Sequence, residues 1–260
     1  MSAVVELRLD GKVVIVTGAT QGLGAAFARR CHALGAQLVL TGRDRARGEA
    51  VREELDAAFV EAELQDVEAC RAVVAAAQET YGRLDGLVNA AGLSSRGTLD
   101  STSVELWDRL FAINVRAPFV LTQAAAGLMR QAGGGSVVNI ITMSSHGGQP
   151  DLMAYSASKG ALATFTRNAA HALARDRIRV NGLNIGWTAT DGEHVVQTDE
   201  GAPEDWLAEA DASRPLGRLL RPEDIAPIVT HLLSDAAVMI TGSVIDWDQV
   251  VLGTHGEVPA

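Results

Sequence analysis

The sequence has few cysteines, few aromatic residues and no long apolar run. Only two of its 260 residues are cysteine and 4% are aromatic. No stretch approaches the roughly 18 uninterrupted apolar residues of a membrane-spanning helix. Cys31 and Cys70 both lie in helical patterns. We expect them to be free thiols in a reducing cytosol. Residues 1–12 carry acids and no apolar core, so we expect no secretory signal and a soluble, cytoplasmic protein.

Basic residues are also scarce relative to acidic ones. The chain has 22 Lys and Arg against 32 Asp and Glu, a formal net charge of -10. This balance disfavours nucleic acid and anionic membranes as partners, and we expect a small-molecule substrate instead. The six histidines are scattered, and neither an HExxH nor a CxxC pattern occurs. We therefore expect no metal site.

Short β-branched apolar runs alternate with helical patterns along the chain. Such alternation is typical of a parallel sheet covered by helices on both faces. We expect one domain over residues 1–260, in which the polar stretch 187–216 forms a lid over the substrate. The predicted strands are Val13–Thr17, Gln37–Thr41, Ala58–Leu64, Leu84–Asn89, Ser136–Thr142, Ile178–Ile185 and Ser243–Trp247. The predicted helices are Gly22–Leu34, Asp44–Ala57, Val67–Tyr81, Ser103–Met129 with an interruption near Pro118, Met153–Arg175 and Ala226–Leu233.

A glycine-rich turn follows the first predicted strand. Residues 17–24 read TGATQGLG, and a helical pattern begins there. Glycine permits a tight turn and lets the backbone approach a pyrophosphate, while the helix offers free N–H groups to the phosphates. A glycine-rich turn without a ligand is the simpler interpretation of the motif alone. Its place after the first strand of an α/β chain favours a nucleotide site.

Tyr155 and Lys159 lie four residues apart in a predicted helix, so their side chains share one face. An unperturbed tyrosine has a pKa of about 10 and is a poor base at neutral pH. A nearby ammonium group favours the phenolate and lowers that pKa. Taken alone, such a pair is more often an ordinary feature of a helix surface than a catalytic pair.

Several motifs occur together in a fixed order. After TGATQGLG come NAAG at residues 89–92, Asn114 in FAINVRAPF, YSASK at 155–159, RVN at 179–181 with Gly186, and a terminal TG with Asp248. This series resembles the short-chain dehydrogenase/reductase family over about residues 10–250. The resemblance implies a Rossmann-type, doubly wound, seven-stranded parallel sheet. It also implies an NAD(P)-dependent oxidoreductase that transfers hydride between nicotinamide and a secondary alcohol or ketone.

The resemblance carries over a set of cofactor-binding residues. Asn89 would link neighbouring strands, and Glu63 with Leu64 stands where the family has an Asp-hydrophobic pair beside adenine. Thr188 and Thr190 would lie at the nicotinamide carboxamide. The full set is Gly18, Thr20, Gln21, Gly22, Leu23, Gly24, Arg43, Glu63, Leu64, Asn89, Ala91, Gly92, Tyr155, Lys159, Gly186, Thr188 and Thr190.

The end of the second strand decides between NAD and NADP. An acid there accepts from the ribose 2′-hydroxyl, whereas a basic residue binds a 2′-phosphate. Gly42 stands where NAD-preferring members carry Asp, and Arg43 follows it. Gln21 replaces a basic residue that some NADP-preferring members have, and Asp44 lies close by. We favour NADP, with NAD as the alternative.

The resemblance also assigns the catalytic groups. Tyr155 would exchange the hydroxyl proton, Lys159 would lower the tyrosine pKa and hold the nicotinamide ribose, and Asn114 would hold a water. The family uses a serine at the end of the fifth strand to orient the substrate. Here the same offset from Tyr155 gives Thr142, and Ser144 is the alternative if the strand end bulges.

The substrate is less well defined by the sequence. Ser144, His146, Gln149 and Trp187 are candidate substrate contacts, and their polarity indicates a sugar, a polyol or a hydroxy acid. A non-catalytic dinucleotide-binding redox sensor is the alternative function. A sugar-nucleotide epimerase is a further alternative, although the chain looks too short for it. The resemblance implies a homotetramer or homodimer.

Overall fold

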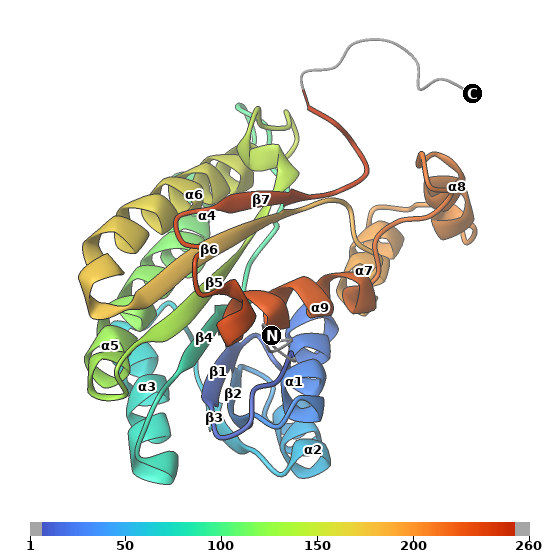
Figure 1. Ribbon diagram of the computed structural model, residues 1–260. Helices are drawn as coiled ribbons and strands as arrows, with labels where there is room; N and C mark the ends of the chain where they lie inside the picture. The colour runs from blue at the N-terminus through green and yellow to red at the C-terminus, as the bar shows by residue number, and fades with distance from the viewer. Residues whose placement is uncertain (1–6, 253–260) are drawn as a thin grey trace.

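A single seven-stranded parallel sheet forms the centre of the protein (Figure 1). The computed structural model describes residues 7–252. Residues 1–6 and 253–260 lie outside the described residues. They include half of the N-terminal segment 1–12, in which we expected no secretory signal, and both ends of the expected domain 1–260. The strand order is β3-β2-β1-β4-β5-β6-β7, which confirms the predicted doubly wound sheet. The strands are β1 (Val13–Thr17), β2 (Gln37–Gly42), β3 (Ala58–Glu61), β4 (Gly86–Asn89), β5 (Gly135–Thr142), β6 (Ile178–Ile185) and β7 (Val244–Trp247).

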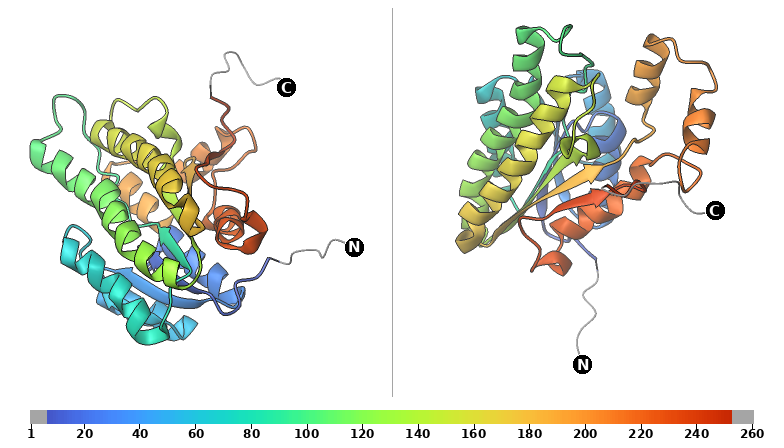
Figure 2. Two further views of the ribbon diagram at one scale, coloured as in Figure 1. Left: turned by 60° about the vertical axis from the view of Figure 1, so that its left-hand side comes forward. Right: turned by 90° about the horizontal axis from the view of Figure 1, so that it is seen from above.

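Helices cover both faces of the sheet and bury it between two apolar layers (Figures 1 and 2). One layer is formed by α1 (Gly22–Ala33), α2 (Arg45–Leu55) and α9 (Pro222–Leu233). The other is formed by α3 (Val67–Tyr81), α5 (Ala117–Gln131) and α6 (Met153–Leu173). Strands covered on both faces must be apolar throughout, which is why β1 reads VVIVT and is buried at every position. Short 3-10 turns are η2 (Met143–Ser145), η3 (Ala174–Asp176) and η4 (Asp235–Ala237).

The long helix predicted over Ser103–Met129 is broken into three parts. The structure has α4 (Val104–Phe111), a π-helical turn η1 (Ala112–Arg116), and then α5. Pro118 lies in the first turn of α5, directly after the π-helical turn. The wider π-turn holds Asn114, whose side chain is fully buried. Such turns are frequent at functional sites.

The stretch 187–216 contains two helices where the sequence indicated an irregular segment. They are α7 (Asp191–Asp199) and α8 (Trp206–Ala212), and Figure 2 shows them standing apart from the two helical layers. Thr190 caps α7 by accepting a hydrogen bond from the backbone N–H of Glu193 at 3.1 Å. Short, polar helices of this kind are hard to detect from periodicity, because the sequence contributes few apolar positions to a core.

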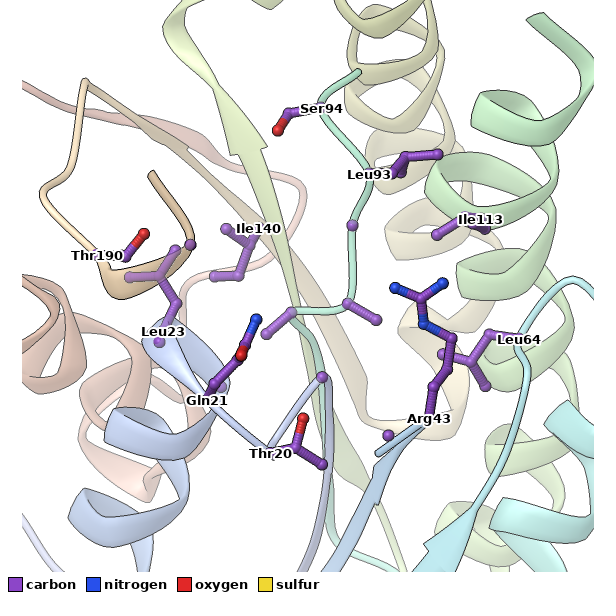
Figure 3. A pocket seen from close by; sticks show the side chains of 18 of the residues that line it. Thr20, Gln21, Leu23, Arg43, Leu64, Leu93, Ser94, Ile113, Ile140 and Thr190 are labelled. Carbon is purple, nitrogen blue, oxygen red and sulfur yellow. The ribbon is translucent and has the colours of Figure 1, made fainter. Parts of the chain in front are cut away.

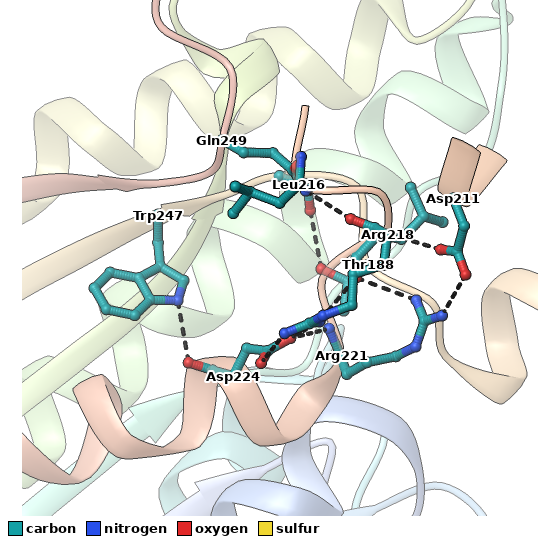
Figure 4. A network of polar contacts seen from close by, with 10 residues as sticks. Thr188, Asp211, Leu216, Arg218, Arg221, Asp224, Trp247 and Gln249 are labelled. Atoms are coloured by element: carbon teal, nitrogen blue, oxygen red, sulfur yellow. Dashed lines mark hydrogen bonds and ion pairs between the residues drawn. The ribbon is translucent and has the colours of Figure 1, made fainter. Parts of the chain in front are cut away.

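The base of this segment is tied to the sheet (Figure 4). Thr188 and Leu220 form an isolated parallel bridge, so the outgoing and returning chains pair with each other. Arg218 forms an ion pair with Asp224 at the start of α9, and Arg221 forms one with Asp211 in α8. The two helices therefore rise from a braced stem.

A chain of buried polar groups crosses from the sheet to α6. Asn89 in β4 donates to Asn139 in β5 at 2.8 Å, and Asn139 donates to the Thr166 hydroxyl in α6 at 2.9 Å. Asn89 and Asn139 face each other in the register of the two strands. All three side chains are buried, and the two asparagines depend on this chain for their side-chain hydrogen bonds, whereas the Thr166 hydroxyl also donates to the Leu162 carbonyl at 2.8 Å.

Within residues 7–252, no helix combines the length and the apolar character needed to cross a lipid bilayer.

The polar chain generates a prediction about stability. Replacing Asn139 with Ala leaves the Asn89 amide and the Thr166 hydroxyl without this partner. We expect a loss of about 1–3 kcal/mol in the free energy of unfolding, measured by urea denaturation. Gln37→Ala, at the exposed first position of β2, is the control and should change it by less than about 0.5 kcal/mol. Equal stability of the two variants would contradict a structural role for this chain.

Candidate functional site

A cavity of about 380 Å³ opens at the carboxyl ends of β1 and β4 (Figure 3). The strand order reverses between these two strands, and ligands of open α/β sheets bind at such reversal points. Many of the residues predicted to bind a cofactor line it. They are Gly18, Thr20, Gln21, Gly22, Leu23, Gly24, Arg43, Glu63, Leu64, Ala91, Gly92, Tyr155, Lys159 and Thr190.

The glycine turn forms one wall of the cavity and is packed without room for side chains. A Cβ atom on Gly24 would lie 2.2 Å from the carbonyl oxygen of Gly18, and one on Gly18 would lie 2.9 Å from the Cα of Ala91. Gly18 also has a φ of 66°, which favours glycine. The Thr17 hydroxyl joins the two strand ends, because it accepts from the N–H groups of Ala90 and Ala91, each at 3.0 Å.

The first turn of α1 faces the cavity with N–H groups that its own helix cannot satisfy. Gln21, the N-cap residue, makes no side-chain hydrogen bond to this turn. Its side chain accepts instead from the guanidinium of Arg47 in α2. An anion placed at this helix end would therefore meet free donors and the positive end of the helix dipole.

The end of β2 supplies a positive charge to the same cavity. Figure 3 shows Arg43 reaching from the strand end toward Leu64. Its guanidinium lies 3.8 Å from the Glu63 carboxylate, and both side chains are well exposed to solvent. A Cβ atom on the neighbouring Gly42 would lie 2.4 Å from the methyl group of Thr20, so an acidic side chain fits there only if Thr20 turns.

Tyr155 and Lys159 both line the cavity from the first turns of α6. The Lys159 ammonium donates to the Ile140 carbonyl at 2.8 Å and lies 5.9 Å from the centre of the Tyr155 ring. Burial lowers the pKa of Lys159 to about 8. Burial also raises the pKa of Tyr155 to about 12, a shift that a hydrogen bond with Thr142 opposes and the charge of Glu193 reinforces.

The direction of the Tyr155 shift differs from the one expected from the sequence. We expected the nearby ammonium to lower the phenol pKa. Burial instead raises the pKa of the phenol, and burial also lowers the pKa of the neighbouring Lys159 ammonium to about 8. Tyr155 is therefore protonated at neutral pH.

Thr142 is the last residue of β5, and Ser144 lies in the 3-10 turn η2 that follows. Thr142 is hydrogen-bonded to Tyr155. Ser144, in the following 3-10 turn, donates to the Thr142 hydroxyl at 3.4 Å. The structure thus places the threonine hydroxyl next to the phenol.

Asn114 lies beside Lys159 and holds the loop that follows β4. Its carbonyl oxygen accepts from the Leu93 N–H at 2.9 Å, while its amide donates to the Leu93 carbonyl and to the Ser158 hydroxyl. A Cβ atom on Gly92 would lie 3.4 Å from the Lys159 nitrogen and 3.6 Å from the Asn114 oxygen. The π-turn therefore positions the loop that carries Gly92.

Other predicted residues lie outside the cavity lining. Asn89 is buried in the sheet, Thr188 is paired in the stem, and Gly186 packs where a Cβ atom would lie 2.1 Å from the Asp248 carboxylate. Three of the four candidate substrate contacts, His146, Gln149 and Trp187, are exposed to solvent. His146 is bound instead to Asp246 of β7 at 2.7 Å.

The sequence analysis missed Glu193, which lines the cavity from the first turn of α7. Ile113, Ile140, Ile141, Ile185, Gly192 and Val196 also line it and were not singled out. The only available signal for Glu193 was its position three residues after Thr190. Among residues 7–252, no group of three or more His, Cys, Asp or Glu side chains is placed to hold a metal ion.

Comparison with known proteins gives consistent matches over nearly the whole chain. Residues 18–249 match a family described as enoyl-(acyl carrier protein) reductase. An uncharacterised oxidoreductase of Methylorubrum extorquens is 36% identical over 92% of this chain and 97% of its own. A 3alpha-hydroxysteroid dehydrogenase of Mediterraneibacter gnavus is 34% identical over 93% of this chain and 97% of its own. The structure of a short-chain type dehydrogenase/reductase from Mycobacterium ulcerans superposes with a TM-score of 0.86 at 27% identity, covering 93% of this chain and 90% of that one.

Proposed function

Since the chain belongs to the short-chain dehydrogenase/reductase family, we propose that it is an NAD(P)-dependent oxidoreductase that interconverts a secondary alcohol and its ketone. One observation carries the proposal. The glycine turn, Tyr155 and Lys159 line the same cavity, so a dinucleotide on the turn would extend toward the phenol and the ammonium. A dinucleotide-binding redox sensor needs the glycine turn but not this pair.

The residues of the cavity fit a dinucleotide. The close approach of Gly18 and Gly24 leaves backbone where a pyrophosphate can lie, and the free N–H groups of α1 supply its donors. Glu63 and Leu64 would contact adenine, and Lys159 would hold the nicotinamide ribose. Thr190 would contact the carboxamide. When bound, the nicotinamide supplies or accepts the hydride.

Tyr155 is the proton donor or acceptor in this proposal. With its raised pKa it is protonated at neutral pH, so it can donate to the oxygen of a ketone that is being reduced. In the reverse direction it must accept the alcohol proton, and the Lys159 charge then stabilises the phenolate. Thr142, bonded to Tyr155, would orient the substrate oxygen.

We propose NADP rather than NAD as the preferred cofactor. Arg43 reaches into the cavity beside the strand end, and its charge would meet a 2′-phosphate. Gly42 offers no acid to a ribose 2′-hydroxyl, and Thr20 leaves little room for one. Arg47 adds a second positive charge near the same edge through its contact with Gln21.

We further propose a cytoplasmic enzyme that acts on a small molecule and assembles as a homodimer or homotetramer. Cys31 and Cys70 are free and buried, which is compatible with a reducing compartment. Trp107 on α4 and Phe119 on α5 are 38% and 44% exposed, which suits a surface that another copy would cover.

Tyr155→Phe tests the proposed function. Removing the phenol hydroxyl should lower kcat by about 10²- to 10⁴-fold, because general acid–base catalysis contributes this much. NADPH binding, measured by fluorescence titration, should persist. The matched control is Tyr81→Phe, which removes the only other tyrosine hydroxyl, bonded to the Leu38 carbonyl at 3.2 Å and remote from the cavity. No turnover of any secondary alcohol or ketone by the unmodified protein, with either cofactor bound, would favour the redox sensor.

Thr142→Ala and Ser144→Ala distinguish the two candidate orienting hydroxyls. We expect the threonine variant to lose about ten- to a thousandfold in kcat, as is typical when one polarising donor is removed. The serine variant should lose much less, because Thr142 interacts with Tyr155 directly whereas the Ser144 hydroxyl donates to Thr142. Thr142→Ser keeps the hydroxyl and should retain most of the activity. Full turnover by both alanine variants would contradict an orienting hydroxyl.

Arg43→Ala tests the cofactor preference. A lost charge-assisted hydrogen bond should weaken NADPH binding by about ten- to a hundredfold and leave NADH binding nearly unchanged. Isothermal titration calorimetry with both cofactors measures the difference. Arg52→Ala is the control, because Arg52 lies in α2 and pairs with Glu49 and Glu53 away from the cavity. An equal loss for both cofactors would argue against recognition of a 2′-phosphate.

A further inference from the structure

Glu193 brings a carboxylate to the lid side of the cavity. Its Oε1 atom accepts two hydrogen bonds, from the Trp187 indole and from the Gln197 amide, each at 2.8 Å. Gln197 lies one turn later in α7, and Trp187 lies just before the stem. These two donors fix the orientation of the carboxylate and leave its second oxygen, Oε2, without a hydrogen bond to any residue from 7 to 252.

The position of Glu193 in α7 has a simpler explanation that its contacts do not support. A threonine N-cap followed three residues later by glutamate is typical of a capping box, in which the glutamate side chain returns to the N-cap backbone N–H. Thr190 does cap the helix through the Glu193 N–H. The Glu193 carboxylate, however, is bonded to Trp187 and Gln197 instead. Helix capping therefore accounts for the threonine but not for the direction of the carboxylate.

The charge of Glu193 is not neutralised by an ion pair within residues 7–252. Two cations that contact this segment, Arg96 and Arg214, have other partners. Arg96 pairs with Glu200 at the end of α7, and Arg214 lies 5.2 Å from the centre of the Trp187 ring. Lys159, also in the cavity, donates to the Ile140 carbonyl. A ligand beside Tyr155 would therefore face a fixed, unpaired negative charge.

We propose that Glu193 is a specificity-determining residue that selects substrates carrying a second hydrogen-bond donor next to the reacting carbon. This inference rests on the proposed oxidoreductase function. The free Oε2 atom would accept from a neighbouring hydroxyl or ammonium group of the substrate. A carboxylate or phosphate in the same place would be repelled and would leave Oε2 without a donor.

The proposal narrows the substrate classes that the sequence left open. Sugars, polyols and amino alcohols have the required donor, whereas a hydroxy acid puts an anion beside the reacting carbon. All three accepted classes share one chemistry, a hydrogen-bond donor to a carboxylate. The ammonium would gain more than the hydroxyl, because its interaction is also an attraction between opposite charges.

Three alcohols of matched size and one somewhat larger hydroxy acid test the proposal. 1,2-Propanediol, 1-amino-2-propanol, 2-butanol and 3-hydroxybutanoate have the same methyl-carbinol end and differ in the group on the next carbon. We expect kcat/KM for the diol and the amino alcohol to exceed that for 2-butanol, and 3-hydroxybutanoate to be the poorest. The substitution Glu193→Gln removes the negative charge. It should reduce the ratio of kcat/KM for the amino alcohol to kcat/KM for 3-hydroxybutanoate by about tenfold or more.

Asp199→Asn is the matched control. Asp199 lies at the end of the same helix and is exposed to solvent, so the substitution removes one negative charge outside the cavity. The Asp199→Asn variant should show the same ratios of kcat/KM between the four substrates as the unmodified enzyme. If both substitutions alter the ratios equally, long-range charge and not Glu193 sets the preference, which overturns the proposal.

The remaining outcomes separate this inference from the proposed function. If kcat/KM of the unmodified enzyme for the diol and the amino alcohol does not exceed kcat/KM for 3-hydroxybutanoate, the proposed role of Glu193 is contradicted. This result does not require the Glu193→Gln variant to fold. Oxidation of 2-butanol without discrimination leaves the oxidoreductase function intact and overturns only the specificity. Loss of all turnover, with every secondary alcohol and with either cofactor, overturns the function itself.

Discussion

The buried chain from Asn89 through Asn139 to Thr166 fixes the three elements on which the site depends. β4 leads into the loop with Gly92, β5 ends at Thr142, and α6 carries Tyr155 and Lys159. Packing of apolar side chains alone tolerates small slips between a helix and a sheet, because it is not directional. Hydrogen bonds between buried amides are directional, and an unpaired amide is costly. The register of β4 against β5 and the position of α6 on the sheet are therefore set together.

Much of the fold followed from local patterns, and the reasons are physical. Apolar β-branched runs such as VVIVT identify strands buried on both faces, and the glycine turn identifies the end of β1. The edge strand β3 is shorter than predicted, because only residues 58–61 pair with β2. The π-turn around Asn114 adds one residue to a helical turn without changing the composition. Periodicity in the sequence therefore cannot reveal it.

The candidate site was predictable where chemistry depends on spacing along one element. Tyr155 and Lys159 share a helix face, and the glycines share a turn, so their neighbourhood is local. Arg43 and Glu193 reach the cavity from separate elements, and Thr142 approaches Tyr155 from a third, so their arrangement depends on how those elements pack. The prediction from the sequence that the pKa of Tyr155 is lowered was wrong for the same reason. A pairwise argument includes the ammonium but not the burial that acts on both groups.

The stacking of two indoles in the segment that contains α7 and α8 gives the protein an optical reporter of its own. Trp187 precedes α7 and Trp206 begins α8, and their ring centres lie 6.0 Å apart with planes inclined by 24°. They are two of the four tryptophans in the chain, and Trp187 also donates to Glu193. Stacked aromatic rings are sensitive to small changes in offset and angle. The tryptophan emission of the unlabelled protein should therefore respond to any change in the stacking of these two rings.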